Sequence, residues 1–516
     1  MENGIDKEYQ RTKKCADIYA DSTAEYVLPD YKGDIRKLLM TDAELRPSGK
    51  FSSGGEVEFS GIVVYNIVYA DSEGQINSAS FTSDYEYKVK CSEENYVGAY
   101  SDARVASSSI RLVGPRKISA KATVAASVNL TERASVNISG TAFDGVESPQ
   151  FLNKCISTRT SAVSESVERE YAEVVASLDG AISDEVNVIY SGAEVEIDDY
   201  ELVDGVLRVS GDITLFALIK NGEEPIFIAE REQQFEQDIP FPGADTDMSF
   251  IPDATVVSLR ESINPTESGS DVVLSAIVEF SAVGHTNTDT EIVEDAYMQS
   301  CVTENIYDEL PYTSFCEIAK AHCGIEGSIE RDGFDCEGVR EAIILSAHPR
   351  IESVDAVDGA VCVRGEIRFL GVACGVDTNG KSVYAPIKIN AEFAENVKTS
   401  CHISDKTRLE PKIALSNVRG GIDEHEVFAS ADIKTSVCVF EDNSAHVLVK
   451  SDARADLPFE ERKAQIRVYY PSAGESLFSI AKKFHTTAEK VAMDNSLSAS
   501  AAVSDTEPLA KRLMIF

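Results

Sequence analysis

Eight consecutive residues, Gly375 to Ser382 (GVDTNGKS), match the spacing of a phosphate-binding P-loop. Such a loop must join a strand to a helix, because the N–H groups at the helix N-terminus hold the phosphates. The residues after Ser382 are Val, Tyr, Ala and Pro386, which favour an extended strand. Asn379-Gly380 is also a common hairpin-turn dipeptide. We therefore predict a β-hairpin here, and neither a nucleotide nor any other cofactor.

Three cysteines, Cys316, Cys323 and Cys336, lie near His322, and these residue types bind zinc. Structural zinc sites usually contain closely spaced ligand pairs, whereas these cysteines are widely separated and His322 directly adjoins Cys323. The sequence therefore predicts no metal site. We expect a partly helical connection in which the thiols pack as small apolar groups.

Motifs typical of catalysis are not evident. The chain has no G-x-S-x-G nucleophile elbow, and its seven histidines are dispersed. With 87 Asp and Glu residues, neighbouring carboxylates are expected by chance. The sequence thus predicts no catalytic residues and a non-enzymatic protein.

The composition indicates a large, acidic, globular protein. At 516 residues the chain is too long for one core, so three or four domains are expected. The net charge of −39 argues against nucleic acid and anionic membranes. This negative charge either keeps the protein soluble or attracts a partner with a basic surface. The eleven scattered cysteines, and the lack of an apolar leader or spanning segment, predict a cytoplasmic protein without a membrane span.

One pattern of alternating apolar and polar residues occurs three times, starting at Gly55, Gly205 and Gly359. Period-two alternation predicts strands with one buried face. Each copy has a glycine at its seventh position, then a turn rich in Asp, Asn and Gly, then a second alternating run; the glycines are Gly61, Gly211 and Gly365. A glycine inside a strand usually marks a bulge or a close backbone approach. We expect that role for all three.

Further strand-like segments recur around each copy. DIRKLLMTDAEL, EVNVIYSGAEVEI and REAIILSAHPRIES lie upstream, and KISAKATVAASV, VVLSAIVEFSAV and VFASADIKTSVCVF lie downstream. The predicted fold class is mainly β, with three tandem β-sandwich or barrel-like modules at 1–150, 151–303 and 304–458. A small domain is predicted at 466–516.

That C-terminal segment has a different pattern. Ser476 can cap a helix, and Leu477, Ile480, Ala481 and Phe484 share one face of that helix. Thr486 and Glu489 have the spacing of a capping box for a second helix, and Asn495 is a suitable end for it. Short strands are expected before and after the two helices. Residues 466–516 carry six basic and five acidic side chains, so almost all the negative charge lies in the rest of the chain.

The segment from Val468 to Leu497 resembles a LysM domain, a small βααβ unit that usually binds glycans containing N-acetylglucosamine. The resemblance implies partner or glycan contacts from the loop after the first strand and the loop after the second helix. The implied contact residues are Ser476, Leu477, Phe478, His485 and Asn495. Leu477 fits a core position better than a partner contact. Phe478 lies one step off the apolar face, so we expect it to be exposed and available to a partner.

The segment YVLPDYKGDIRKLL at 26–39 and the glycine-centred strands resemble the SPOCS domain of spore-coat-associated proteins. Three SPOCS-like modules followed by a LysM domain are similar in layout to coat-morphogenesis proteins of endospore formers. The resemblance implies a scaffold or adaptor on the mother-cell side of the forespore surface. Its LysM domain would dock to a SpoIVA-like coat ATPase or another coat protein. The alternative is a peptidoglycan- or cortex-binding protein that uses the LysM domain to hold N-acetylglucosamine-containing glycan.

Overall fold

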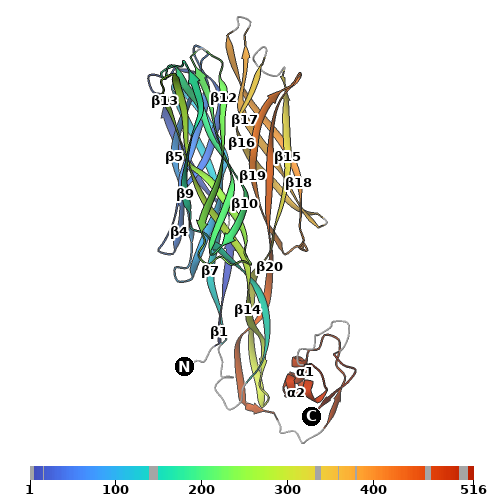
Figure 1. The fold of residues 1–516 in the computed structure, drawn as a ribbon. Coiled ribbons are helices and arrows are strands. Elements are labelled where there is room, and N and C mark those ends of the chain that lie inside the picture. The colour runs from blue at the N-terminus through green and yellow to red at the C-terminus, as the bar shows by residue number, and fades with distance from the viewer. Residues whose placement is uncertain are drawn as a thin grey trace.

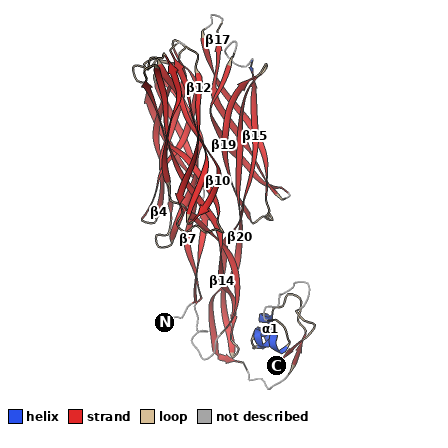
Figure 2. Cartoon of the chain, viewed as in Figure 1, coloured by secondary structure: helices blue, strands red, loops and turns tan. Residues whose placement is uncertain are grey.

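The computed structural model describes residues 5–15, 17–138, 149–222, 224–331, 339–357, 359–377, 381–459, 466–498 and 509–516. Over these residues the fold is mainly β, as predicted, with two short helices near the C-terminus (Figure 2). No helix in the described ranges is long and apolar enough to cross a membrane. The strands form an elongated body, and the helices belong to a small unit at one end of it (Figure 1).

The first group of strands forms two sheets. One sheet contains β3 (Ile35–Ser53), β4 (Glu56–Asp71) and β5 (Ile76–Lys90) in the order β3-β4-β5. In the other, β7 (Lys117–Ile138) pairs with β6 (Tyr96–Gly114) on one side. On its other side β7 pairs with β2 (Ile18–Val27) and then with β1 (Ile5–Lys14). Alternate side chains of both sheets fill a shared core that includes Val57, Val63, Val124 and Val128.

The second group repeats this arrangement. Its central sheet contains β10 (Val186–Val203), β11 (Val206–Asn221) and β12 (Phe227–Pro240). The long strand β14 (Gly269–Tyr297) pairs with β13 (Ser249–Pro265) on one side. On its other side β14 pairs with β9 (Val167–Asp179) and β8 (Gln150–Val163). Leu207, Ile213, Leu274 and Phe280 lie in the core between the sheets.

In the third group, β16 (Glu341–Val357), β17 (Ala360–Val376) and β18 (Ser382–Lys398) form the central sheet. The 33-residue strand β20 (Glu426–Pro458) pairs with β19 (Thr407–Ile422) and with β15 (Cys301–Glu330). β15 corrects one expectation, since Cys316, His322 and Cys323 lie on this continuous strand and not on a partly helical connection. Cys336 lies outside the described residues.

The three repeated glycines have the role that their spacing predicts. Beside each, the pairing strand shifts register, between Pro47 and Gly49, Ile197 and Asp199, and Ile351 and Ser353. The shift brings a backbone carbonyl against the glycine. A Cβ atom would lie 2.6 Å from the oxygen of Arg46 at Gly61, 1.9 Å from that of Glu196 at Gly211, and 2.1 Å from that of Arg350 at Gly365. Only glycine leaves room for this bulge.

The P-loop-like segment joins two strands. β17 ends at Val376 and β18 begins at Ser382, so the chain continues as a strand where a phosphate-binding loop requires a helix. The predicted turn residues Asn379 and Gly380 lie outside the described residues. The structure thus supports the hairpin interpretation of this segment.

The three strand groups pack against one another in two shared apolar clusters. Leu39 of β3, Ile189 of β10 and Ile343 of β16 meet in one apolar cluster. Towards the other end Tyr9, Ile156 and Leu310, from β1, β8 and β15, meet in a second cluster. Here the body narrows to a stalk, which consists of β1, β8, the start of β15 and the C-terminal parts of β7, β14 and β20 (Figure 1). The stalk tip is the turn between β14 and β15.

Polar contacts also join the groups. Nε2 of His348 in β16 lies 2.6 Å from Oδ1 of Asp42 in β3. The hydroxyl of Tyr190 in β10 donates to the carboxylate of Glu44 at 3.2 Å. These side chains come from all three groups, so the junction between them is both apolar and hydrogen-bonded.

Candidate functional site

The C-terminal unit is built from β21 (Arg467–Tyr469), α1 (Leu477–Phe484), α2 (Ala488–Asp494) and β22 (Leu513–Ile515). β21 ends before Pro471, which has no N–H to donate to a ladder. Ser476 caps α1 as predicted, because its hydroxyl accepts from the N–H of Ser479 at 3.1 Å. α2 is capped by Thr487 and not, as predicted, by Thr486. The hydroxyl of Thr487 accepts from the N–H of Lys490 at 3.1 Å.

The helices and the two-stranded sheet enclose a small core. Its buried members include Leu477, Ile480, Ala481, Val491, Ala492, Leu513 and Ile515. Of the two interpretations of Leu477, the structure supports the core one, with 5% of the residue exposed. Leu477 is therefore a packing residue of the unit.

Phe478 corrects the expectation of an exposed partner contact. It is 9% exposed, and its ring packs edge-on against Tyr297, with centroids 5.1 Å apart. Tyr297 is the last residue of β14, at the stalk tip. The periodicity of α1 predicts that Phe478 points away from the other apolar residues of the helix. In the structure Tyr297 of the stalk covers this side chain.

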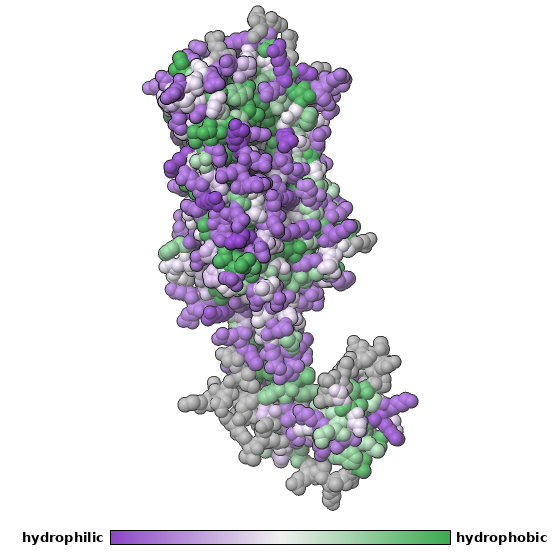
Figure 3. Space-filling view, viewed as in Figure 1, coloured by the Kyte–Doolittle hydropathy of each residue, from purple (hydrophilic) through white to green (hydrophobic). Residues whose placement is uncertain are grey.

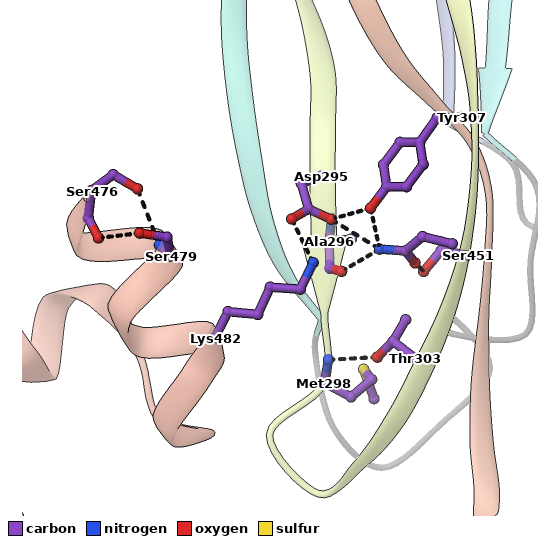
Figure 4. Close-up of polar contacts among 10 residues, drawn as sticks. Asp295, Ala296, Met298, Thr303, Tyr307, Ser451, Ser476, Ser479 and Lys482 are labelled. Carbon is purple, nitrogen blue, oxygen red and sulfur yellow. Dashed lines mark hydrogen bonds and ion pairs between the residues drawn. The ribbon is translucent and has the colours of Figure 1, made fainter. Parts of the chain in front are cut away.

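Two polar contacts fix the same face of the unit to the stalk. Nζ of Lys482 lies 2.5 Å from Oδ2 of Asp295 (Figure 4). The hydroxyl of Tyr297 donates to the carbonyl of Thr486 at 2.6 Å. Burial raises the pKa of Tyr297 to about 12, so the hydroxyl remains a proton donor. Asp295 and Tyr297 of the stalk, together with the residues that they contact in the C-terminal unit, Phe478, Lys482 and Thr486, are called the seat of that unit.

The stalk holds Asp295 in position. A register shift between Val293 and Asp295 in the pairing with β8 marks a bulge, which can redirect a side chain. Oδ1 of Asp295 accepts from the hydroxyl of Tyr307 at 2.7 Å and from the amide of Asn305 at 2.9 Å (Figure 4). Oδ2 is then directed to Lys482. The sequence offered no local signal for this role, because Asp295 is one of many acidic residues and lies 187 residues from its partner.

The two remaining predicted contact residues make structural contacts. His485 ends α1 in the left-handed conformation, and its ring stacks on Phe459 with centroids 3.5 Å apart. The amide of Asn495 donates to the carbonyls of Val491 and Met514 at 2.9 and 2.7 Å. Its oxygen accepts from the N–H of Met514 at 2.6 Å. Asn495 therefore ends α2, as predicted, and also ties it to β22.

The loop after β21 lies outside the seat and has its own polar cluster. The hydroxyl of Tyr469 donates to Glu475 at 2.7 Å, and Nζ of Lys483 donates to the same hydroxyl at 3.0 Å. The N–H of Ser472 donates to Glu475 at 2.7 Å. The hydrogen bond from Tyr469, followed by that from Ser472, lowers the pKa of Glu475. The cluster fixes the conformation of this loop.

A cavity of about 560 Å³ lies between the second and third strand groups, lined by β10, β13, β15, β19 and β20. Ion pairs cross it, from Lys412 to Asp253 and from Lys434 to Glu196. Nζ of Lys320 lies 4.9 Å from the ring centre of Tyr200. Since the charges are paired across the cavity, we interpret it as part of the junction between the groups. Among the described residues, no group of three or more His, Cys, Asp or Glu side chains is arranged to hold a metal ion.

No protein-family description, curated protein or solved structure matches this chain.

Proposed function

We propose that this protein is a non-enzymatic scaffold or adaptor in endospore envelope assembly. In domain order it resembles SipL, a spore-coat morphogenetic protein. We assign the three strand groups as SPOCS-like modules and the C-terminal unit as a LysM domain. The protein would act in the mother-cell cytoplasm, at the forespore surface. Its C-terminal unit would dock to a coat morphogenetic partner such as a SpoIVA-like ATPase.

The observation that carries this proposal is the seat. The contacts of Tyr297 with Thr486 and of Asp295 with Lys482 hold the small unit at the tip of a long body. The shared apolar clusters join the three strand groups within that body. A small unit fixed to one end of a long body suits a spacer that presents a docking unit at a defined place.

Glycan binding is the second candidate function. The order strand, helix, helix, strand and the polar cluster around Glu475 favour it, because the loop after β21 stays clear of the seat. In this alternative the unit would hold N-acetylglucosamine-containing peptidoglycan or cortex glycan.

Two binding measurements separate these functions. The full chain and a chain ending at residue 459 are each mixed with insoluble peptidoglycan and with the purified coat ATPase. The scaffold proposal expects the full chain to bind the ATPase and the shortened chain to lose that binding. Retention on peptidoglycan alone would refute it. A fluorescent fusion in sporulating cells is expected at the forespore surface, and signal on the vegetative wall would contradict the proposal.

A further inference from the structure

The two-stranded sheet of the C-terminal unit has an apolar outer face. In its antiparallel pairing Val468 lies opposite Met514, and Tyr469 lies opposite Leu513. Side chains alternate between the faces of a strand, so Leu513 and Ile515 point to the helices and are buried. Val468 and Met514 point away from the helices and are 51% and 37% exposed.

The same alternation continues beyond the paired residues. Ile466 and Tyr470 flank Val468 at period two and are 64% and 69% exposed, and Phe516 follows Met514 and is 56% exposed. We call Ile466, Val468, Tyr470, Met514 and Phe516 the apolar strip. Figure 3 shows apolar surface on the small unit, beside a body that is mostly hydrophilic in this view. Large exposed apolar side chains gathered on one face are typical of a contact surface.

The charge around the strip is opposite to that of the whole chain. Residues 466–471 and 509–516 contain Arg467, Lys511 and Arg512 and no Asp or Glu. All three cations are exposed. The chain as a whole carries −39. A partner that covers the strip is therefore expected to bring apolar side chains bordered by acidic ones.

The strip takes no part in the seat. The seat uses Phe478 and Lys482 of α1 and the turn residue Thr486, all on the helix side of the sheet. The strip lies on the side of the sheet turned away from the helices. One face of the unit thus holds it to the stalk, and the other is open for docking.

We propose that the apolar strip is a docking surface for an acidic protein partner. The inference deepens the proposed scaffold function and rests on it. A protein suits this surface better than an anionic bilayer, because an extended bilayer would also meet the acidic remainder of the chain, whereas a protein can contact the strip and its three cations alone. The paired strands β21 and β22 present their exposed side chains in two adjacent rows, against which a strand or helix of the partner can pack.

The test uses the full chain and the purified coat ATPase as the probe. Two exposed strip residues are replaced together, Val468→Ser with Met514→Ser. The matched control is Met493→Ser, which changes an 81% exposed methionine on α2. The strip variant is expected to bind about tenfold more weakly or worse, because central apolar contacts dominate most interfaces. The control is expected to bind like the unchanged chain.

A second variant keeps the apolar side chains and reverses one charge. Arg512→Glu is expected to weaken binding and to reduce its dependence on salt, because one attractive pair at the rim is lost. Thermal unfolding of each variant shows whether the fold is retained. All of the changed side chains are exposed, so the unfolding temperatures are expected to stay close to that of the unchanged chain.

The outcomes separate this inference from the function on which it rests. If the unchanged chain and the strip variant bind the ATPase equally, the strip inference is wrong and the scaffold function stands. If the unchanged chain does not bind the ATPase, both are wrong. Strip-dependent binding to vesicles of phosphatidylglycerol and phosphatidylcholine, without binding to the ATPase, would identify a membrane surface instead. Strip-dependent self-association in sedimentation, again without ATPase binding, would identify a second copy of the chain.

Discussion

The hydroxyl of Tyr297 donates a 2.6 Å hydrogen bond to the carbonyl of Thr486, a residue 189 positions further along the chain. This contact joins the end of β14 to the turn between the two helices. With the ring contact to Phe478, it defines how the C-terminal unit is carried by the stalk. The seat explains why Phe478, which the sequence assigned to a partner, contacts the protein itself.

Replacing Tyr297 by Phe tests this hydrogen bond. The change keeps the ring against Phe478 and removes only the hydroxyl, so the seat is expected to weaken by about 1 kcal/mol. Hydrogen exchange of the amides in 477–490 is expected to become faster. Tyr19→Phe, at a tyrosine that is 65% exposed, is the matched control. Unchanged exchange in the Tyr297 variant would show that the hydroxyl does not hold the unit.

Lys482→Met tests the ion pair of the seat. Nζ of Lys482 contacts Asp295, and the two side chains are 38% and 21% exposed. A partly exposed pair of this kind is expected to contribute up to about 1 kcal/mol and to weaken with salt. Limited proteolysis between β20 and β21 is expected to be faster in the variant at low salt. Lys490→Met changes an exposed lysine of α2 and is expected to leave cleavage unchanged.

The strand pattern was predictable because it is local. Alternation places β4, β11 and β17 and their partners, and the glycine in each repeat marks the bulge beside it. The cap at Ser476 is also set by its neighbours in sequence. The seat was not predictable in this way. Phe478 is buried by a residue from β14, and Thr486 is buried too, with its carbonyl bonded to Tyr297. Periodicity within a helix carries no information about what covers its outer side.

In the cysteine-containing segment, a partly helical connection was predicted where the structure has a strand. Cys316 and Cys323 lie on β15, where Phe315 and Glu317 border a register shift in the pairing with β20. The bulge interrupts the regular alternation of the strand at this point. Long-range pairing with β20 over the whole of β15 determines the strand.

Gly365→Ala tests the bulge in the third group. The added Cβ would lie 2.1 Å from the carbonyl oxygen of Arg350 and 2.9 Å from the ring of Phe393, so the backbone must move. The cost is expected to be about 1–3 kcal/mol, seen as a lower unfolding temperature. Gly114→Ala is the control, because no atom lies within 4 Å of a Cβ there. Equal unfolding temperatures for the two variants would contradict the proposed role of the glycine.

The His348–Asp42 pair is expected to make stability depend on pH. Burial alone would lower the pKa of His348, but the charge of Asp42, its hydrogen bond and the charge of Glu44 outweigh burial and raise it. A raised histidine pKa stabilises the fold below the unfolded value of about 6.5. That contribution is lost as pH rises through the folded pKa. Unfolding temperatures at about pH 5.5 and about pH 8 are expected to differ less in His348→Gln than in the unchanged chain. His402→Gln, at an exposed histidine, is expected to keep the full difference.

Glu194 is also expected to make the fold less stable as pH rises, but over a lower pH range than His348. Burial, with the charges of Glu230 and Glu196, raises the pKa of Glu194 to about 7. A carboxyl with a raised folded pKa favours the fold when protonated, so its contribution falls as pH rises from about 4.3 towards that value. Glu194→Gln removes the ionisation and is expected to flatten the stability profile between these values. Glu224→Gln, at an exposed carboxyl, serves as the control. A profile that Glu194→Gln leaves unchanged would contradict this account.

Arg159 is expected to be one of the most sensitive positions in the body, because its side chain contacts all three strand groups. It is 1% exposed, and its guanidinium donates to the hydroxyl of Tyr100 at 2.5 Å and to Ser161 at 2.9 Å. Its Cζ atom also lies 3.8 Å from the ring centre of Phe440. Arg159→Ala removes these contacts together and leaves a cavity, so a loss of about 2–5 kcal/mol in the free energy of unfolding is expected.

The measurement is denaturant unfolding of the full chain, followed by tyrosine fluorescence. Arg169→Ala is the matched control, since this arginine also lies over an aromatic ring, 5.0 Å from that of Tyr171, but on the outside of the second group. If the two variants lose the same stability, Arg159 does not join the groups. If Arg159→Ala also splits the transition into separate steps, the three groups depend on this contact to unfold as one body, since cooperative unfolding requires coupling between the parts.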